Sequence, residues 1–436
     1  VLYIAAPARC CSKEYHSVMK KLCSVLTALT LVLSMTACAQ QTGAGASEDS
    51  SAPDSSSASQ AVPTATPTPT PEPKDYVVGF DPLTGEQVDE NDRSRPIAVM
   101  IQNNKAGYPQ WGIKGAEVLV EAITEGKTTS MMAMYSGHEG LSEKVGAVGP
   151  ARDLFWQIAM PTDSILMQIG SNVYASNLLN TYQYQNLDGH YVGVTAFDLD
   201  YEKDKTANHE YCWYTTQELM EAGLEHYGMS KDGDRLSLFN YARPGQEAPA
   251  SADSGNASSA STSASTANAG SQPMEATRIE ITFAEENTIP LLYNGDSNRW
   301  EKYDIDWEPQ TDGTYPEDMD PMEKILTFDN VLVLYCSAGV KDDGYTRDYD
   351  LSEGTGLYLN GPTCKMIRWK KDGITGGFTI YDQDGKTEYP IQPGKCYIAI
   401  YGGFDGQAIK VQDSSSQDLA LWDDPAPMKT PENQEG

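Results

Sequence analysis

Basic residues are scarce in this chain of 436 residues, which carries 31 lysines and arginines against 62 aspartates and glutamates. Nucleic-acid binding needs clustered lysine and arginine, so this composition excludes a nucleic-acid partner. Removal of residues 1–37 would leave 27 basic residues against 61 acidic ones. An acidic surface can attract divalent cations or basic polymers, but a solvated and mutually repulsive surface is the favoured interpretation.

Motifs of the common hydrolases are also missing. The dipeptides His138-Glu139 and His209-Glu210 lack the second histidine of HExxH, which argues against a zinc protease. No GxSxG occurs, so a nucleophile elbow is not expected. Asp382 and Asp384 resemble the start of a calcium loop, but the remaining ligands are missing, so we expect a hairpin turn there. The sequence therefore predicts no metal and no cofactor.

Cysteines are few once Cys38 and the residues before it are set aside, and none of the remainder forms a CxxC pair. That spacing disfavours a zinc knuckle. Free thiols are the favoured state, and a disulfide among the last three is the alternative. The four residues concerned are Cys212, Cys336, Cys364 and Cys396.

The N-terminal region has the pattern of a lipoprotein signal peptide over residues 19–37. Lys20 and Lys21 precede an uncharged stretch that is too short to span a bilayer but suits a signal peptide. The segment ends in Met35-Thr36-Ala37-Cys38, which resembles a lipobox. We therefore expect diacylglycerol on Cys38, which anchors the chain to the lipid bilayer at the extracytoplasmic face of the cell membrane. The alternatives are a core helix or a plain cleaved signal, and residues 1–18 are interpreted as an upstream mis-start.

Low-complexity segments divide the rest of the chain. Residues 38–74 form a Ser/Thr/Pro linker, residues 248–272 a Ser/Ala linker, and residues 412–436 an acidic tail. Nothing in them could bury enough apolar surface to offset the entropy of ordering, so we predict that they are disordered. The segments between them, 75–247 and 273–411, are each long enough for a core of their own.

The first long segment mixes strand and helix patterns, whereas the second is almost all strand. We predict an α+β fold: a mixed α/β N-terminal domain, then the low-complexity linker, then a β-rich C-terminal domain. Thr215 and Glu218 have the spacing of a capping box for a helix that Gly228 ends. In the second segment, the glycine pair at 354 and 356 predicts a bend or bulge rather than a phosphate-binding loop.

One group of polar residues in the first segment is a candidate site. Glu121 and Glu125 end a buried strand, and Arg152 and Asp153 open the next helix. Asp188 and His209 follow downstream. An arginine can orient carboxylates or an anionic ligand, and a carboxylate with histidine could perform acid–base chemistry. The favoured alternative is an internal Arg152–carboxylate pair that closes a turn.

Several stretches in a shared order resemble the YerB-like lipoprotein family. They are Arg95 to Asn103, Pro109-Gln110, Gly115 to Glu117, Glu121 to Gly126, Ala151 to Asp153, Leu187 to Gly189, Ala276 to Phe283, Asn330 to Val333 and Gly354 to Gly356. The resemblance implies a two-domain, membrane-anchored lipoprotein whose molecular function is not established. This chain departs from the family pattern at Gly149, where relatives carry an arginine, and at Gln168, where they tend to carry a histidine.

The sequence as a whole favours a binding or scaffold module of the cell envelope, with a cell-wall polymer or another envelope protein as its partner. An envelope hydrolase or transferase that uses Glu121, Glu125, Arg152 and His209 is the first alternative. A solute-binding lipoprotein is the second.

Overall fold

The computed structural model describes residues 76–422, apart from 138–140, 142 and 245–271. The predicted signal peptide, Cys38, the first linker and nearly all of the second linker lie outside the described residues, as does the chain after residue 422. In the described part of the chain, no helix is both long enough and apolar enough to cross a membrane.

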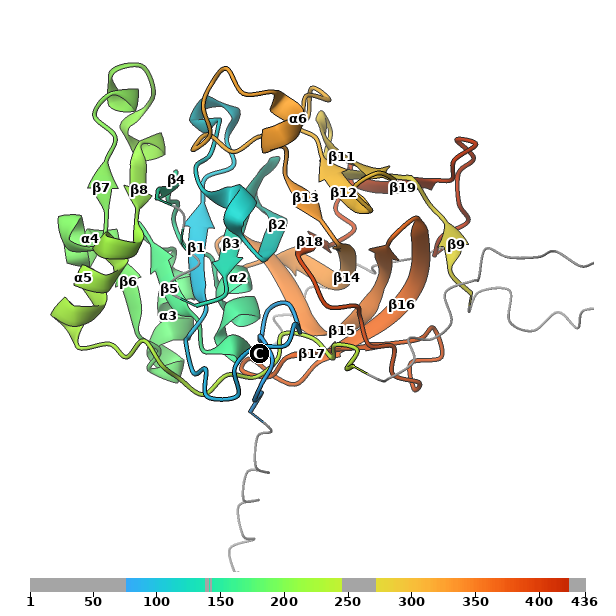
Figure 1. The fold of residues 1–436 in the computed structure, drawn as a ribbon, viewed down its shortest axis with the longest axis horizontal. Coiled ribbons are helices and arrows are strands. Elements are labelled where there is room, and N and C mark those ends of the chain that lie inside the picture. The colour runs from blue at the N-terminus through green and yellow to red at the C-terminus, as the bar shows by residue number, and fades with distance from the viewer. Residues whose placement is uncertain (1–75, 138–140, 142, 245–271, 423–436) are drawn as a thin grey trace, which may run out of the picture. The chain divides into compact units, whose positions relative to one another are not determined.

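A central sheet of eleven strands runs through both long segments of the chain (Figure 1). Its order is β17-β16-β15-β14-β18-β2-β3-β1-β5-β6, and β9 pairs with β16. The bounds are β1 Ile97–Ile101, β2 Val118–Glu125, β3 Thr128–Tyr135, β5 Ile165–Gln168, β6 Asn186–Asp188, β9 Met274–Glu275, β14 Asn330–Val340, β15 Arg347–Asn360, β16 Thr363–Lys371, β17 Phe378–Tyr381 and β18 Cys396–Tyr401.

The strand β18 joins the two segments. It pairs in parallel with β14 on one side and with β2, almost 280 residues earlier in the sequence, on the other. Every residue of β18 is buried, and its sequence CYIAIY is apolar apart from the two phenol groups. Parallel strands covered on both faces are apolar along their whole length, which is what β18 and the neighbouring part of β14 show.

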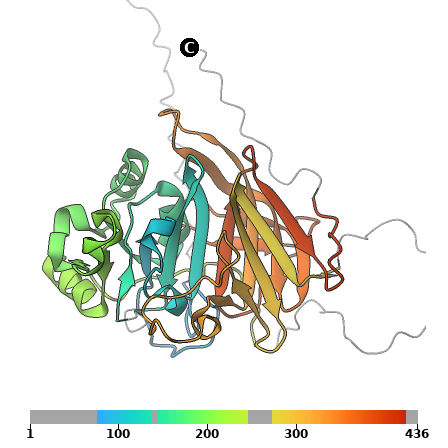
Figure 2. The ribbon, with the colours of Figure 1, turned by 90° about the horizontal axis from the view of Figure 1, so that it is seen from above.

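Two apolar cores cover the opposite faces of this sheet. Alternate residues of β1 point to different cores, with Ile97, Val99 and Ile101 in one and Ala98 and Met100 in the other. The first core lies against α5 and a five-stranded sheet, and the second lies against α2 and α3. Figure 2 shows the helices of the first segment, in green, on one side of the molecule and the strands of the second segment, in yellow to red, on the other.

The remaining elements surround the central sheet. The five-stranded sheet has the order β13-β12-β11-β10-β19, and a three-stranded sheet has the order β4-β8-β7. The strands are β4 Val145–Gly146, β7 Asp198–Leu199, β8 Trp213–Thr215, β10 Arg278–Ala284, β11 Asn287–Asn294, β12 Arg299–Lys302, β13 Thr327–Phe328 and β19 Ala408–Gln412. The α-helices are α2 Asp153–Ala159, α3 Val173–Tyr182, α4 Gly189–Val192, α5 Gln217–Tyr227 and α6 Pro321–Lys324. The 3-10 helices are η1 Lys105–Gly107, η2 Ile113–Gly115, η4 Met160–Thr162, η5 Gly193–Thr195, η6 Lys203–Lys205 and η7 His209–Tyr211.

The predicted fold class is confirmed, because helices and strands mix in the first segment and strands dominate the second. Each segment is long enough for a core of its own, but the two segments share their cores. Both cores contain residues of both segments, such as Val99 with Val333 and Met100 with Leu332. The reason is the position of β18, which comes from the second segment but pairs with a strand of the first.

The capping box predicted at Thr215 is wrong by one residue. Thr216 is the N-cap of α5, and its hydroxyl oxygen accepts a hydrogen bond from the backbone N–H of Leu219. Thr215 is instead buried in β8, where its hydroxyl donates to the carbonyl of Ala196. The predicted end of the helix is confirmed, since Gly228 takes the left-handed conformation with φ 61°.

Candidate functional site

Glu121 lies in the middle of the buried strand β2 and has four polar partners. Its Oε1 accepts hydrogen bonds from Asn103 Nδ2 and from Thr129 Oγ1, both at 2.8 Å. Its Oε2 accepts a hydrogen bond from the hydroxyl of Tyr397 at 2.7 Å. The same oxygen lies 3.2 Å from the ammonium nitrogen of Lys302.

The Glu121–Lys302 pair links the two long segments inside the molecule, because Lys302 ends β12 and Tyr397 belongs to β18. Neither charged side chain has any exposed surface. Taking two charges out of water is costly unless further hydrogen bonds satisfy their remaining atoms, and the partners of Glu121 do so. Burial, and next the charge of Glu121, raise the pKa of Tyr397 well above its usual value, so this phenol stays a hydrogen-bond donor.

A second layer of polar groups extends from this pair toward the surface. The side-chain amide oxygen Oδ1 of Asn103 accepts hydrogen bonds from Tyr108 OH at 3.0 Å and from Gln110 Nε2 at 3.1 Å. On the other side, the ammonium of Lys302 donates to Gln310 Oε1. Burial, followed by the charges of Glu121 and Asp304, raises the pKa of Tyr108.

A pocket of about 250 Å³ lies where this network meets the surface, between the loop before β2 and the loop after β12. Within the described chain, Gln110 Oε1 and Gln310 Nε2 are buried atoms that have no hydrogen-bond partner. The pocket is lined by Tyr108, Pro109, Gln110, Asp304, Pro309, Gln310 and Thr311.

The two loops that form the pocket are fixed to each other by hydrogen bonds. Gly313 N–H donates to the carbonyl of Gln110 at 2.7 Å. The carboxylate of Asp312 accepts hydrogen bonds from the backbone N–H groups of Gly112 and Lys114, at 2.9 and 2.8 Å. Asp312 is almost fully buried, so the pocket walls are held in place by contacts between the two segments.

Arg152 pairs internally with Glu125, as the favoured interpretation of the sequence expected. The Nη2 of Arg152 donates to Glu125 Oε2 at 3.2 Å, and its Nε donates to Oε1 of the same carboxylate. The two side chains are 18% and 14% exposed. A two-point contact of this kind fixes the end of β2 to the N-terminus of α2.

The other two predicted binding residues also have partners within the protein. Asp153 forms an ion pair with Lys341 at 2.9 Å, and Lys341 lies at the same distance from Asp348. Asp188 is the N-cap of α4, and its Oδ1 accepts the backbone N–H groups of Gly170 and His190 at 2.8 and 3.0 Å.

The structure does not bring His209 to the acidic cluster. The Nδ1 of its exposed ring lies 3.0 Å from Asp204 Oδ1, and the ring packs edge-on against Trp213. Among the described residues, His209 has no hydrogen bond or ion pair with Glu121, Glu125 or Arg152, and Glu121 does not contact Arg152 in either way. The three separate environments do not form one acid–base site.

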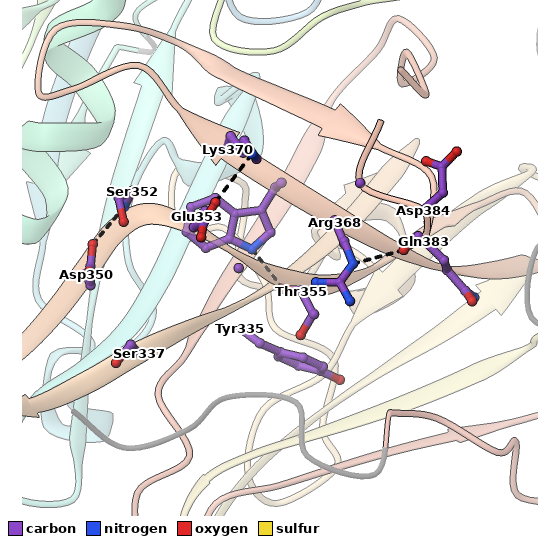
Figure 3. Close-up of a pocket in the computed structure, with 13 residues that line it drawn as sticks. Tyr335, Ser337, Asp350, Ser352, Glu353, Thr355, Arg368, Lys370, Gln383 and Asp384 are labelled. Atoms are coloured by element: carbon purple, nitrogen blue, oxygen red, sulfur yellow. Dashed lines mark hydrogen bonds and ion pairs between the residues drawn. The ribbon is translucent and has the colours of Figure 1, made fainter. Parts of the chain in front are cut away.

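A larger concavity, with a volume of about 570 Å³, lies over β14, β15 and β16. Its charged side chains are engaged with one another or with the backbone (Figure 3). Lys370 faces Glu353 at 3.5 Å, and Arg368 Nε donates to the carbonyl of Gln383 at 2.9 Å. Asp384 accepts backbone N–H groups of its own turn, which lower its pKa to about 2.

Residues 382–385 form the predicted turn, and the Gly354 region forms the predicted bulge. The pairing of β14 with β15 shifts register between Cys336 and Ala338, next to the partner position of Gly354. A side chain at Gly354 would meet the carbonyl oxygen of Tyr335 at 2.0 Å, so only glycine fits there. No group of three or more His, Cys, Asp or Glu residues in the described ranges could hold a metal ion. All four described cysteines are free and buried, as the favoured interpretation expected.

Sequence reasoning found Glu121 but missed Lys302, Gln110 and Gln310. Strand alternation offered a signal for Lys302, because it lies two residues after the buried Trp300 and therefore shares its face of β12. A lysine at an inward position is a candidate partner for a buried carboxylate. The two glutamines lie in loops, where side-chain direction has no sequence period.

Comparisons with known proteins agree with this architecture. Residues 83–230 match the family model "Protein of unknown function (DUF3048) N-terminal domain", and residues 279–398 match the model for the DUF3048 C-terminal domain. The chain is 24% identical over 332 residues to "Putative lipoprotein YerB" of Bacillus subtilis (strain 168). The matched residues cover 75% of this chain and 88% of that protein. The crystal structure of YerB from Bacillus subtilis has the same fold, with a TM-score of 0.58 and 20% identity over 76% of this chain and 99% of that one. The two matched domains follow one another in this order and together span more than half of the chain, which therefore belongs to the DUF3048 family and is similar to YerB.

Proposed function

We propose that this protein is a lipoprotein, anchored to the extracytoplasmic face of the cell membrane through Cys38, that acts as a binding module of the cell envelope. The signal pattern that ends at Cys38 supports the anchor. The name of the Bacillus subtilis relative, "Putative lipoprotein YerB", agrees with it.

The observation that carries the binding role is the pocket between the two segments. Its walls include two buried amide groups, each with one hydrogen-bonding atom that lacks a partner in the described part of the chain. Buried polar atoms are almost always paired in folded proteins, so unpaired atoms in residues that line a pocket suit a ligand. The candidate residues of an acid–base site lie apart, which favours binding over hydrolysis or group transfer.

The expected partner is a polymer of the cell wall. A pocket of about 250 Å³ is smaller than the roughly 300–1,000 Å³ of most small-molecule sites. It therefore suits one side group of a larger ligand better than a complete solute.

The experiment for this function measures binding of the full-length protein to soluble wall fragments by calorimetry. Thr311→Phe, at the pocket wall, should weaken binding strongly, whereas Ser352→Phe, in the larger concavity of Figure 3, should not. The proposal fails if no wall fragment binds, or if Ser352→Phe alone weakens binding. Fractionation of cells with a labelled fatty acid tests the anchor: Cys38→Ala should lose the label and leave the membrane fraction, and retained label would contradict the anchor.

A further inference from the structure

The orientation of Gln110 in the pocket is set by the buried Glu121. Glu121 accepts a hydrogen bond from the side-chain nitrogen Nδ2 of Asn103. The side-chain oxygen Oδ1 of Asn103 must therefore point toward Tyr108 and Gln110. Gln110 then donates its own amide nitrogen to Asn103 Oδ1 and to the carbonyl of Gln102, at 3.1 and 3.2 Å. Its oxygen Oε1 is the atom left without a partner, so Gln110 offers an acceptor.

The orientation of Gln310 is set in the same way by Lys302. An ammonium group can only donate, so it requires the amide oxygen of Gln310 rather than its nitrogen. The nitrogen Nε2 of Gln310 has no partner among the described residues, so this residue offers a donor. Gln110 and Gln310 are 0% and 3% exposed, and both line the pocket.

We propose that this pocket binds a secondary amide group. Neither Gln110 Oε1 nor Gln310 Nε2 has accessible surface in the free protein, so binding requires a small movement of the two pocket loops. The carbonyl oxygen of the ligand then accepts a hydrogen bond from Gln310 Nε2, and the N–H of the ligand donates to Gln110 Oε1. Pro109 and Pro309 in the pocket wall provide apolar surface for the methyl group beside the amide.

The chemistry of the walls disfavours charged ligands. An anion would meet the carboxylate of Asp304 and the oxygen of Gln110, and a cation would meet the N–H groups of Gln310. A neutral group with one donor and one acceptor matches both unpaired atoms. In a wall polymer this chemistry occurs in acetamido sugars and in peptide bonds.

This inference rests on the proposed function, because it names the group of the wall ligand that the pocket recognises. The test titrates the full-length protein with N-acetylglucosamine and with N-acetyl-alanyl-alanine, and uses glucosamine and alanine as controls without the amide. We expect saturable binding of at least one amide compound and none of the controls. Which of the two amides binds more tightly identifies the source.

The variant Gln310→Glu separates a ligand contact from a structural role. Glutamate keeps an oxygen for Lys302, so the fold should be retained, but it places an oxygen where the ligand carbonyl needs a donor. Loss of one such hydrogen bond should weaken amide binding about tenfold or more. Gln407→Glu is the matched control, because Gln407 Nε2 is also buried without a partner, while its oxygen accepts from Gly402 and Phe404 elsewhere.

Each outcome decides between the two proposals. Amide binding that Gln310→Glu weakens and Gln407→Glu does not supports the inference. Wall fragments that bind while neither amide compound does would overturn the amide inference and leave the binding function standing. Equal binding by Gln310→Glu and wild type would show that the amide binds without Gln310 and would overturn the inference. If neither amides nor wall fragments bind, both proposals fall.

Discussion

The ammonium nitrogen of Lys302 lies 3.2 Å from a carboxylate oxygen of Glu121, and neither side chain reaches solvent. The pair connects β12 of the second segment to β2 of the first. It also sets the orientation of the two pocket glutamines through Asn103 and through Lys302 itself. One buried ion pair thus links the stability of the segment junction to the polarity of the pocket.

Removal of one partner should therefore be costly. Lys302→Met leaves the Glu121 carboxylate buried without its cation, and we expect a loss of about 3–5 kcal/mol in the free energy of unfolding. Adding Glu121→Gln to Lys302→Met removes the unpaired charge and should restore part of that loss. Urea denaturation of Lys302→Met, Glu121→Gln and the double variant measures the coupling. Purely additive losses would contradict the pairing.

The Arg152–Glu125 pair should contribute to stability. We expect Arg152→Ala to cost about 1–3 kcal/mol, because a charge-assisted hydrogen-bonded pair near the surface is lost while the carboxylate stays largely buried. Lys127→Ala, which removes a fully exposed ion pair with Glu285, should leave the melting temperature unchanged. A change below about 0.5 kcal/mol for Arg152→Ala would instead point to a ligand-facing arginine.

Cleavage of the chain between the two segments should not separate them. Nearly all of residues 248–272 lies outside the described residues, and a protease site introduced there would divide the chain between the first segment and β9. Since β18 pairs with both β14 and β2, we expect the two fragments to stay together in gel filtration and to separate only in denaturant. Fragments that elute separately under native conditions would contradict the shared sheet.

Glu117 should make stability depend on pH. Burial raises the pKa of this carboxyl above its usual 4.5, although Lys395 and the N–H of Ser136 lower it and Asp81 adds to the rise. A carboxyl whose pKa is raised in the folded state stabilises the fold at pH values below its pKa in the unfolded state. That stabilisation is lost as the pH rises through the pKa of the folded state. Glu117→Gln should therefore raise the free energy of unfolding at pH 7 and leave it unchanged near pH 4. An equal gain at both pH values would refute this explanation.

Much of the fold could be predicted from local patterns, since the buried strands β1, β2, β3 and β14 are apolar runs with clear ends. The shared sheet could not. The run Cys396–Tyr401 reads as a buried strand, but nothing local indicates that it pairs with Val118–Glu125. Long-range pairing is decided by packing of the whole chain, which a single sequence does not display.

The candidate site shows the same limit. A glutamate in an apolar strand is visible in the sequence, so Glu121 was found, and its separation from His209 follows only from the folded chain. The pocket depends on loop residues that are brought together by Asp312 and Gly313, about 200 positions after the loop they contact.

The side-chain amide signal of Gln310 in a ¹H–¹⁵N correlation spectrum tests the binding account most directly. Loss of that signal in Gln310→Glu would assign it, and the Gln407 signal, assigned likewise, is the internal reference. On titration with N-acetylglucosamine or N-acetyl-alanyl-alanine, we expect the Gln310 signal to shift progressively to saturation while the Gln407 signal stays in place. A Gln310 signal that remains unmoved, while the same compounds shift other signals, would contradict the pocket as the binding site.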